Sequence, residues 1–276
     1  MTVTVGCDPE FVLYDKEQDK IVQTTKVFVP SYFSLSFSTQ EDTMGCELRP
    51  GYSTKPREVV TNLRDIITLW RKTPEKHRLT DRYQLAVGAY CTTHPGQCIG
   101  GHIHVGSLPS CSINNKTYDR WTPHSRRLFL GASYLWILED PNTMWKRRAW
   151  AEGYGGLWEH RGLPDGHGTA EIRHPSSDWL AHPRLMELAL SLVQHLGDTE
   201  ETPDEERIED LSDCYRDLLK DHDVFPKWVR KVNALITDCV PSKILTEIKD
   251  FVPELHKRRR KDGTTILKEE EWHGRG

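Results

Sequence analysis

The segment GGHIHVG at Gly100–Gly106 places two histidines one residue apart in a stretch that otherwise reads as a β-strand. Successive side chains of a strand point to opposite faces of its sheet, so His102 and His104 should project together while Ile103 and Val105 pack on the other side. Two imidazoles on one face can bind a metal ion or a phosphate, or can simply face solvent. The other strands of the chain must distinguish between these interpretations.

The same alternation recurs in three other short segments, CDPEF, CELRP and AEIRH. Their charged pairs are Asp8 and Glu10, Glu47 and Arg49, and Glu171 and Arg173. Leu48 lies between Glu47 and Arg49, and Ile172 lies between Glu171 and Arg173. Pro9 lies between Asp8 and Glu10, and proline is tolerated near the starts and edges of strands. If the four segments share one sheet, their polar side chains converge on one face.

The remaining periodicity predicts an α+β fold. Apolar residues recur at spacings of three and four from Val59 to Trp70, which predicts a helix after Pro56. Further helices are expected over 125–140, 182–196, 211–222, 226–236 and 242–255, and a further strand over 83–91. Residues 149–168 are rich in glycine and aromatic side chains without a helical or strand period, which predicts a functional or mobile loop.

Composition indicates a folded protein of 276 residues with 37% hydrophobic and 28% charged residues, long enough for a main domain with a smaller appendage. No run approaches the roughly 20 apolar residues of a membrane span, and the amino terminus lacks the pattern of a signal peptide. An odd number of scattered cysteines, seven, fits reduced thiols, so we expect a cytoplasmic protein. The basic cluster 256–261 precedes an acidic run at 268–271 and is expected to be a solvated tail.

The polar pairs point to a metal and a phosphate. Crowded carboxylates raise one another's pKa unless a cation intervenes, so Asp8, Glu10, Glu47 and Glu171 imply either a bound metal or shared protons. Oxygen-rich donor sets favour Mg2+ or Mn2+, and arginines beside them suit phosphate oxygens. Metal with arginine therefore suggests a nucleoside triphosphate. The chain contains neither a Walker motif nor a GxGxxG motif, which disfavours a P-loop or a Rossmann site.

Two simpler interpretations stay open at this point. Each Glu/Arg pair alone is more commonly a salt bridge on a solvated sheet face. Alternatively, Cys91, His94, Cys98, His102 and His104 resemble a zinc knuckle in spacing, which would make the protein a zinc-stabilised binding module.

Taken in order, the motifs GCDPEFVLYD, MGCELRP, GGHIHVG and YGGLWEHRGLPDGHGTAEIRHPSSDW resemble the phage-type carboxylate-amine ligases, or amidoligases, of the glutamine synthetase-like superfamily. The resemblance covers residues 1–196. It implies a curved, mainly antiparallel sheet with helices packed on one face and, on the concave face, ATP with two or more divalent ions. It also implies a catalytic domain over 1–197, which leaves 198–276 as a helical C-terminal extension with a charged tail.

Position by position, the resemblance implies metal ligands at Asp8, Glu10, Glu47, His102 and Glu171. It also implies phosphate or acyl-phosphate contacts at His104, Arg161 and Arg173, with Arg49 a weaker counterpart for a substrate carboxylate. The loop before the last strand is longer than the family pattern and adds Asp165 and His167, so substrate selection and the arginine assignment stay open. Either Glu47 or His167 could accept the proton of the amine.

The expected function is ATP-dependent formation of an amide bond through an acyl phosphate. A phosphotransferase on the same scaffold and a metal-dependent hydrolase are the enzymatic alternatives. Small-molecule or peptide carboxylates and amines are the expected partners. Binding to a membrane or to nucleic acid is not expected, but a modified nucleobase is a compatible substrate. The location would be the host cytoplasm if the protein is phage-encoded. The substrates, the oligomeric state and the role of the C-terminal helices are not readable from the sequence.

Overall fold

The computed structural model describes residues 2–22, 31–32, 38–42, 45–72, 82–92, 97–107, 123–148, 155–157, 159–162, 170–199 and 205–272. Its centre is an open sheet whose main path runs β11-β12-β10-β1-β5-β4-β3. These strands are β1 (Thr4–Asp15), β3 (Ser31–Tyr32), β4 (Ser38–Asp42), β5 (Gly45–Arg49), β10 (Gly101–Gly106), β11 (His160–Gly162) and β12 (Ala170–Ile172). Every strand pairing within the described residues is antiparallel, as expected.

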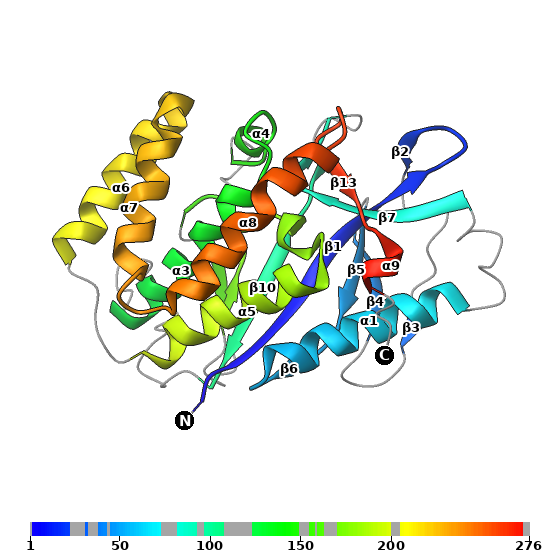
Figure 1. The fold of residues 1–276 in the computed structure, drawn as a ribbon, viewed down its shortest axis with the longest axis horizontal. Helices are drawn as coiled ribbons and strands as arrows, with labels where there is room; N and C mark the ends of the chain where they lie inside the picture. The colour runs from blue at the N-terminus through cyan, green and yellow to red at the C-terminus, as the bar shows by residue number, and fades with distance from the viewer. Residues whose placement is uncertain are drawn as a thin grey trace.

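Strand β1 is the axis of the sheet (Figure 1). The short strands β2 (Lys20–Val22) and β6 (Tyr52–Ser53) also pair with β1. Strand β7 (Tyr83–Gly88) pairs with β1 as well, and β13 (Thr264–Ile266) pairs with β7. The side chains of Val5, Phe11 and Leu13 on one face are fully buried in the main core. The opposite face of β1 carries Asp8 and Glu10. Further along the same face, Val12 belongs to a small separate apolar cluster. The alternation thus separates a packed face from a polar face.

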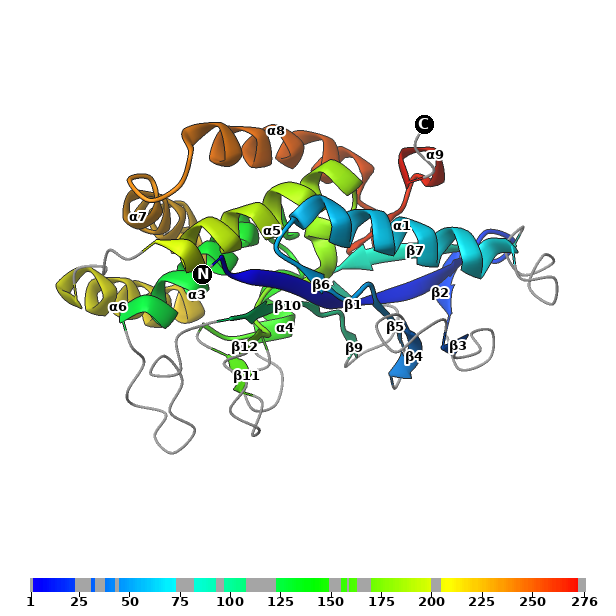
Figure 2. The ribbon, with the colours of Figure 1, turned by 90° about the horizontal axis from the view of Figure 1, so that it is seen from below.

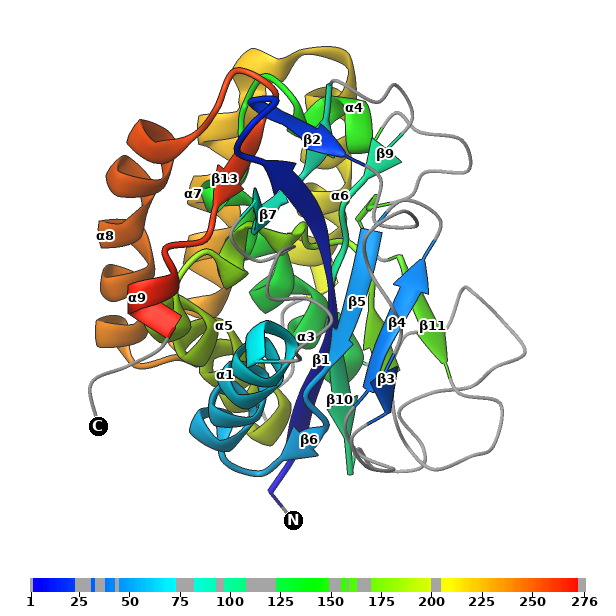
Figure 3. The ribbon, with the colours of Figure 1, turned by 90° about the vertical axis from the view of Figure 1, so that its right-hand side faces the viewer.

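Helices cover the packed face. Figures 2 and 3 show α1 (Pro56–Lys72), α5 (Pro183–Asp198) and α8 (Ser242–Arg258) on one side of β1. On α1, Val59, Leu63 and Ile66 are at most 2% exposed, as their spacing predicts. Burying one such side chain stabilises the fold by roughly 1.5–3 kcal/mol. The expected arrangement, with helices packed on one face of an antiparallel sheet, is confirmed.

A second helical layer packs at one end of the sheet. It consists of α3 (Pro123–Tyr134), the 3-10 helix η4 (Leu135–Leu138), α6 (Glu205–Lys220) and α7 (Phe225–Ile236), with η7 (His222–Val224) between the last two. Trp136 on η4 stacks on Trp228 of α7 with ring centroids 5.2 Å apart, and both side chains are fully buried. Because helices from both proposed domains share this core, the division at residues 197 and 198 stays a prediction.

The basic segment near the C-terminus is not a solvated tail, so that expectation is wrong. After α8 the chain turns at Gly263, whose φ of 86° suits glycine, and β13 then adds to the sheet beside β7. Arg259 pairs with the buried carboxylate of Asp178 at 2.7 Å, and Arg260 pairs with Asp19 at 2.9 Å. Opposite charges on distant parts of the chain allow this segment to pack.

The smaller elements are β8 (Tyr90–Cys91), β9 (Gln97–Cys98), α4 (Met144–Arg148), η6 (Ser177–Leu180) and α9 (Glu269–Trp272). Strand β11 lies inside the segment 149–168, which had no strand period in its sequence. It forms because His160–Gly162 pairs with β12, a contact that a local pattern does not reveal. Among the helices described, none is long and apolar enough to cross a membrane.

Candidate functional site

The register of four strands brings the polar pairs onto one face of the sheet. The directly opposed residues are Asp8 and His102, Glu10 and Glu47, and His104 and Glu171. Opposed side chains on neighbouring antiparallel strands have Cβ atoms about 4.5–5.5 Å apart, so they are within reach of one another. Ile103 and Ile172, which lie between the polar residues, are fully buried on the other face. The expectation that the four segments share one sheet is confirmed.

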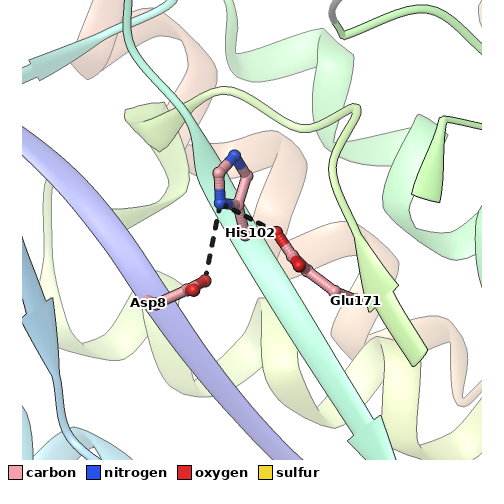
Figure 4. Close-up of side chains that lie close together, drawn as sticks. All are labelled: Asp8, His102 and Glu171. Atoms are coloured by element: carbon pink, nitrogen blue, oxygen red, sulfur yellow. Dashed lines mark ion pairs between the residues drawn. The ribbon is translucent and has the colours of Figure 1, made fainter. Parts of the chain in front are cut away.

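Three of these side chains form a compact group. One donor atom each from Asp8, His102 and Glu171 lies within 4.8 Å of the other two. Nδ1 of His102 is 3.5 Å from Oδ1 of Asp8 and 3.3 Å from Oε1 of Glu171, so the imidazole sits between two carboxylates (Figure 4). The His102 and Glu171 side chains are buried, and the Asp8 side chain is 16% exposed. We call these three residues the carboxylate–histidine group.

The electrostatics of the group favour a positive charge at its centre. Burial lowers the pKa of His102, but the neighbouring carboxylates of Asp8, Glu10 and Glu171 outweigh burial and raise it above its ordinary value. For the acid Asp8 the signs are reversed: burial raises its pKa, but contacts with His102 and His104 outweigh burial and lower the pKa far below its usual range. Two buried carboxylates this close together therefore need a cation, either an imidazolium or a metal ion.

The donor set fits a divalent ion. Oδ1 of Asp8 and Nε2 of His104 are buried and 2.8 Å apart, yet within the described part of the chain neither has a hydrogen-bond partner of acceptable geometry. A buried polar atom in this state is unfavourable, and a shared cation would satisfy both. Two carboxylates with imidazole nitrogen are a donor set suited to Mg2+ or Mn2+.

The other two acids proposed as metal ligands lie next to the group but not in it. Glu10 accepts a 2.6 Å hydrogen bond from the backbone N–H of Gly100, and its other oxygen is 3.8 Å from Nε2 of His102. Glu47 forms an ion pair with Arg49. Burial raises the pKa of Glu47, and this outweighs the opposite effect of Arg49. Glu10 and Glu47 thus form a second acidic pair beside the first group.

Arg173 borders the carboxylate–histidine group. Its Nε is 3.3 Å from Oε1 of Glu171, and its Nη1 is 3.3 Å from Oε1 of Glu159. Arg161 stands opposite Glu171 in the β11–β12 register, but its side chain lies outside what the structure describes. The same holds for Asp165 and His167, which fall in the segment 163–169.

Two residues near the site were missed by sequence reasoning. Arg147 on α4 is fully buried and donates to the carbonyl oxygens of His174 at 2.6 Å and Arg173 at 2.9 Å, so it fixes the backbone after β12. Nothing in its basic context, MWKRR, indicates this role. Glu159 could have been found, because Glu159 and Arg161 repeat the spacing of the ELR and EIR pairs.

The zinc-knuckle interpretation receives no support from the geometry. Cys91 and Cys98 lie on the two-stranded β8–β9 sheet, whereas His102 turns toward Asp8 and Glu171. His94 lies outside the described residues. Among the described residues, the metal-capable group contains no cysteine. Cys7 and Cys46 are buried in the main hydrophobic core.

Comparison with known proteins gives a family and several similar solved structures. A solved structure described as a novel glutamine synthase homolog matches with a TM-score of 0.42 and 13% sequence identity, covering 95% of this chain and 69% of that chain. No curated protein matches the sequence. The family model for phage phiEco32-like COOH-NH2 ligase, type 2, matches residues 5–213, which include every residue of the site. Because the match spans more than half of its length, the chain belongs to the phage phiEco32-like carboxylate-amine ligase family, type 2.

Proposed function

We propose that this ligase is ATP-dependent and forms its amide bond through an acyl phosphate. The observation that carries the proposal is the carboxylate–histidine group of Asp8, His102 and Glu171 bordered by Arg173. Acidic metal ligands beside a guanidinium are the components that phosphoryl transfer requires, because the chemistry depends on positioning and charge stabilisation. Membership of a ligase family supports the carbon–nitrogen bond as the product.

The free carboxylate is a poor electrophile, which explains why phosphorylation is needed. A carboxylate oxygen of the substrate attacks the γ-phosphorus of ATP, and ADP leaves. The amine nitrogen then attacks the acyl carbon, phosphate leaves, and the amine proton passes to a base. Asp8, His102 and Glu171 would hold a divalent ion, and Glu10 with Glu47 a second one. Such an ion, Mg2+ or Mn2+, supplies Lewis-acid stabilisation of phosphate charge.

Arg173 and Arg161 would stabilise the charge of the transferring phosphoryl group, and His104 would contact a phosphate oxygen. Arg173 is held for this task between Glu171 and Glu159, with its carbonyl oxygen fixed by Arg147. The amine proton would pass either to Glu47 or to His167. The proposed substrates are small-molecule or peptide carboxylates and amines. The proposed location is the cytoplasm, which would be that of the host if the protein is phage-encoded.

Trapping with hydroxylamine tests this mechanism. Because hydroxylamine attacks acyl phosphates, incubation of the protein with ATP, Mg2+ and a panel of carboxylates should yield a hydroxamate and ADP in equal amounts for the true substrate. Formation of ADP should stop when metal or carboxylate is left out. ADP with a stable phosphorylated product and no hydroxamate would indicate a phosphotransferase, and ATP consumption that needs no carboxylate would contradict the ligase mechanism.

A further inference from the structure

A cavity of about 560 Å³ lies between the end of α8, the turn before β13 and the loop that leads into α4. The charged or titratable side chains among its described lining residues are Lys146, His256, Arg259, Arg260, Lys261 and Asp140. None of the residues that line it belongs to the candidate site. The cavity is therefore a separate and mainly basic feature of the fold.

Arg259 lines this cavity and is almost completely buried. Its side chain is only 6% exposed, and its Nη2 donates to the carbonyl oxygen of Leu138 and to Oδ1 of Asp178, both at 2.7 Å. Within the described part of the chain, its Nε and Nη1 are buried without any hydrogen-bond partner. Buried donors on a charged group are unfavourable unless an acceptor reaches them. Both nitrogens are closed to solvent, so an anion in the cavity reaches them only when the Arg259 side chain turns toward it.

The acids around the cavity balance the charge of its two arginines but not that of its two lysines. Asp140 uses both carboxylate oxygens within its own turn, accepting from Asn142 and from Oγ1 of Thr143 at 3.0–3.1 Å. Arg260 is paired with Asp19 and Asp262, and Arg259 with Asp178.

Two lysines of the lining keep their charge available. Among the described residues, Lys146 lies over the ring of Tyr90, with Nζ 5.9 Å from the centroid, and forms no ion pair. Lys261 is exposed. Burial and the nearby Arg259 lower the pKa of His256, so lysine and arginine carry the charge of the cavity at neutral pH.

We propose that this cavity binds a small phosphate-bearing anion, such as a diphosphate or a phosphate ester, at a site distinct from the ligase site. Arginine and lysine are the side chains that recognise phosphate oxygens, and Lys146 and Lys261 supply cations that form no ion pair among the described residues. The volume lies in the usual range of small-ligand pockets, about 300–1,000 Å³. The cavity also borders the active region, because α4 presents Lys146 to the cavity and the next residue, Arg147, to the carbonyl oxygen of Arg173.

Calorimetric titration of the full-length protein with pyrophosphate in EDTA tests the proposal. Without divalent ions the ligase site lacks its metal, so binding reports on the cavity. We expect about one pyrophosphate per chain, and at least about tenfold weaker binding to the Lys146→Gln/Lys261→Gln variant. These substitutions avoid Arg259, whose loss would leave Asp178 buried and unpaired. Lys243→Gln, an exposed lysine at the start of α8, is the matched control and should bind as wild type does.

Four outcomes would overturn the assignment. No saturable binding, or equal binding by the Lys146→Gln/Lys261→Gln variant, would remove the cavity as an anion site. Loss of binding in Arg173→Gln would move the anion to the ligase site, because Arg173 is the phosphate contact proposed there. Tighter binding of citrate than of pyrophosphate would assign the cavity to polycarboxylates. A parallel titration with inorganic phosphate distinguishes a diphosphate from a ligand with a single phosphate group. Tighter binding of pyrophosphate than of phosphate supports a ligand with more than one phosphate group.

Discussion

Replacing Glu171 with glutamine should lower the rate of ATP-dependent condensation by roughly 10²–10³-fold, which corresponds to about 2.7–4 kcal/mol of lost electrostatic stabilisation. The substitution keeps the shape of the side chain but removes one of the two carboxylates beside Nδ1 of His102. It also removes one of the two anionic partners of Arg173, at 3.3 Å, and leaves Glu159 as the other. The proposed metal therefore loses a ligand, and the proposed phosphate-binding guanidinium loses one of the carboxylates that position it.

The measurement is the initial rate of ADP release at saturating ATP and Mg2+, with the melting temperature recorded for each variant. Glu187→Gln is the matched control, because Glu187 lies on α5, on the helical face of the sheet, where it pairs with Arg184 at 3.1 Å. Its rate should equal that of the wild type. A Glu171→Gln enzyme that keeps more than half of the wild-type rate would show that this carboxylate is not part of the catalytic machinery.

Replacing Gly101 with alanine should damage both the fold and the site. A Cβ atom at this position would lie 2.2 Å from the carbonyl oxygen of Ser176 and 2.4 Å from Nε1 of Trp179. The backbone of Gly101 is also fixed, because its N–H donates to the carbonyl oxygen of Pro175 at 3.0 Å and its own carbonyl oxygen accepts from Trp179 at 3.2 Å. The clash can be relieved only if β10 and the segment with Ser176 and Trp179 move apart, and the next residue on β10 is His102.

Overpacking of this kind costs about 1–3 kcal/mol, which for a protein of this size lowers the melting temperature by roughly 2–12 °C. We expect in addition weaker metal binding by the folded variant. Gly197→Ala is the control, since its Cβ would meet only side-chain methyl groups at 3.1–3.2 Å and alanine favours the helix. Unchanged stability and metal affinity in Gly101→Ala would mean that the packing of β10 against Ser176 does not position His102.

Alternation in the sequence was sufficient to place the polar residues on one face. The spacing of two in CDPEF, CELRP, GHIHV and AEIRH is a local property, and each segment proved to be a strand of the same sheet. The register was not predictable, because it depends on pairings between segments far apart in the chain. It is the register that selects Asp8, His102 and Glu171 as the compact group and leaves Glu10 and Glu47 beside it.

Long-range contacts explain the expectations that were wrong or missing. The basic segment at the end of α8 has the composition of a solvated tail, but Arg259 finds Asp178 and β13 finds β7. Arg147 has the same surface-like context, yet it is buried because two backbone carbonyl oxygens near the site accept its N–H groups. In each case the partner is more than 25 residues away, so no local pattern carries the information.

The most direct test of the account is calorimetric titration of the wild type and the Glu171→Gln variant with a nonhydrolysable ATP analogue, in Mg2+, in Mn2+ and in EDTA. We expect a component of binding that requires a divalent ion and that is weakened at least about tenfold in Glu171→Gln. The same metal-dependent component should persist in Lys146→Gln/Lys261→Gln, because that variant leaves the carboxylate–histidine group intact. Absence of metal-dependent binding in the wild type, or equal metal-dependent affinity in Glu171→Gln, would contradict the assignment of this group as the metal and nucleotide site.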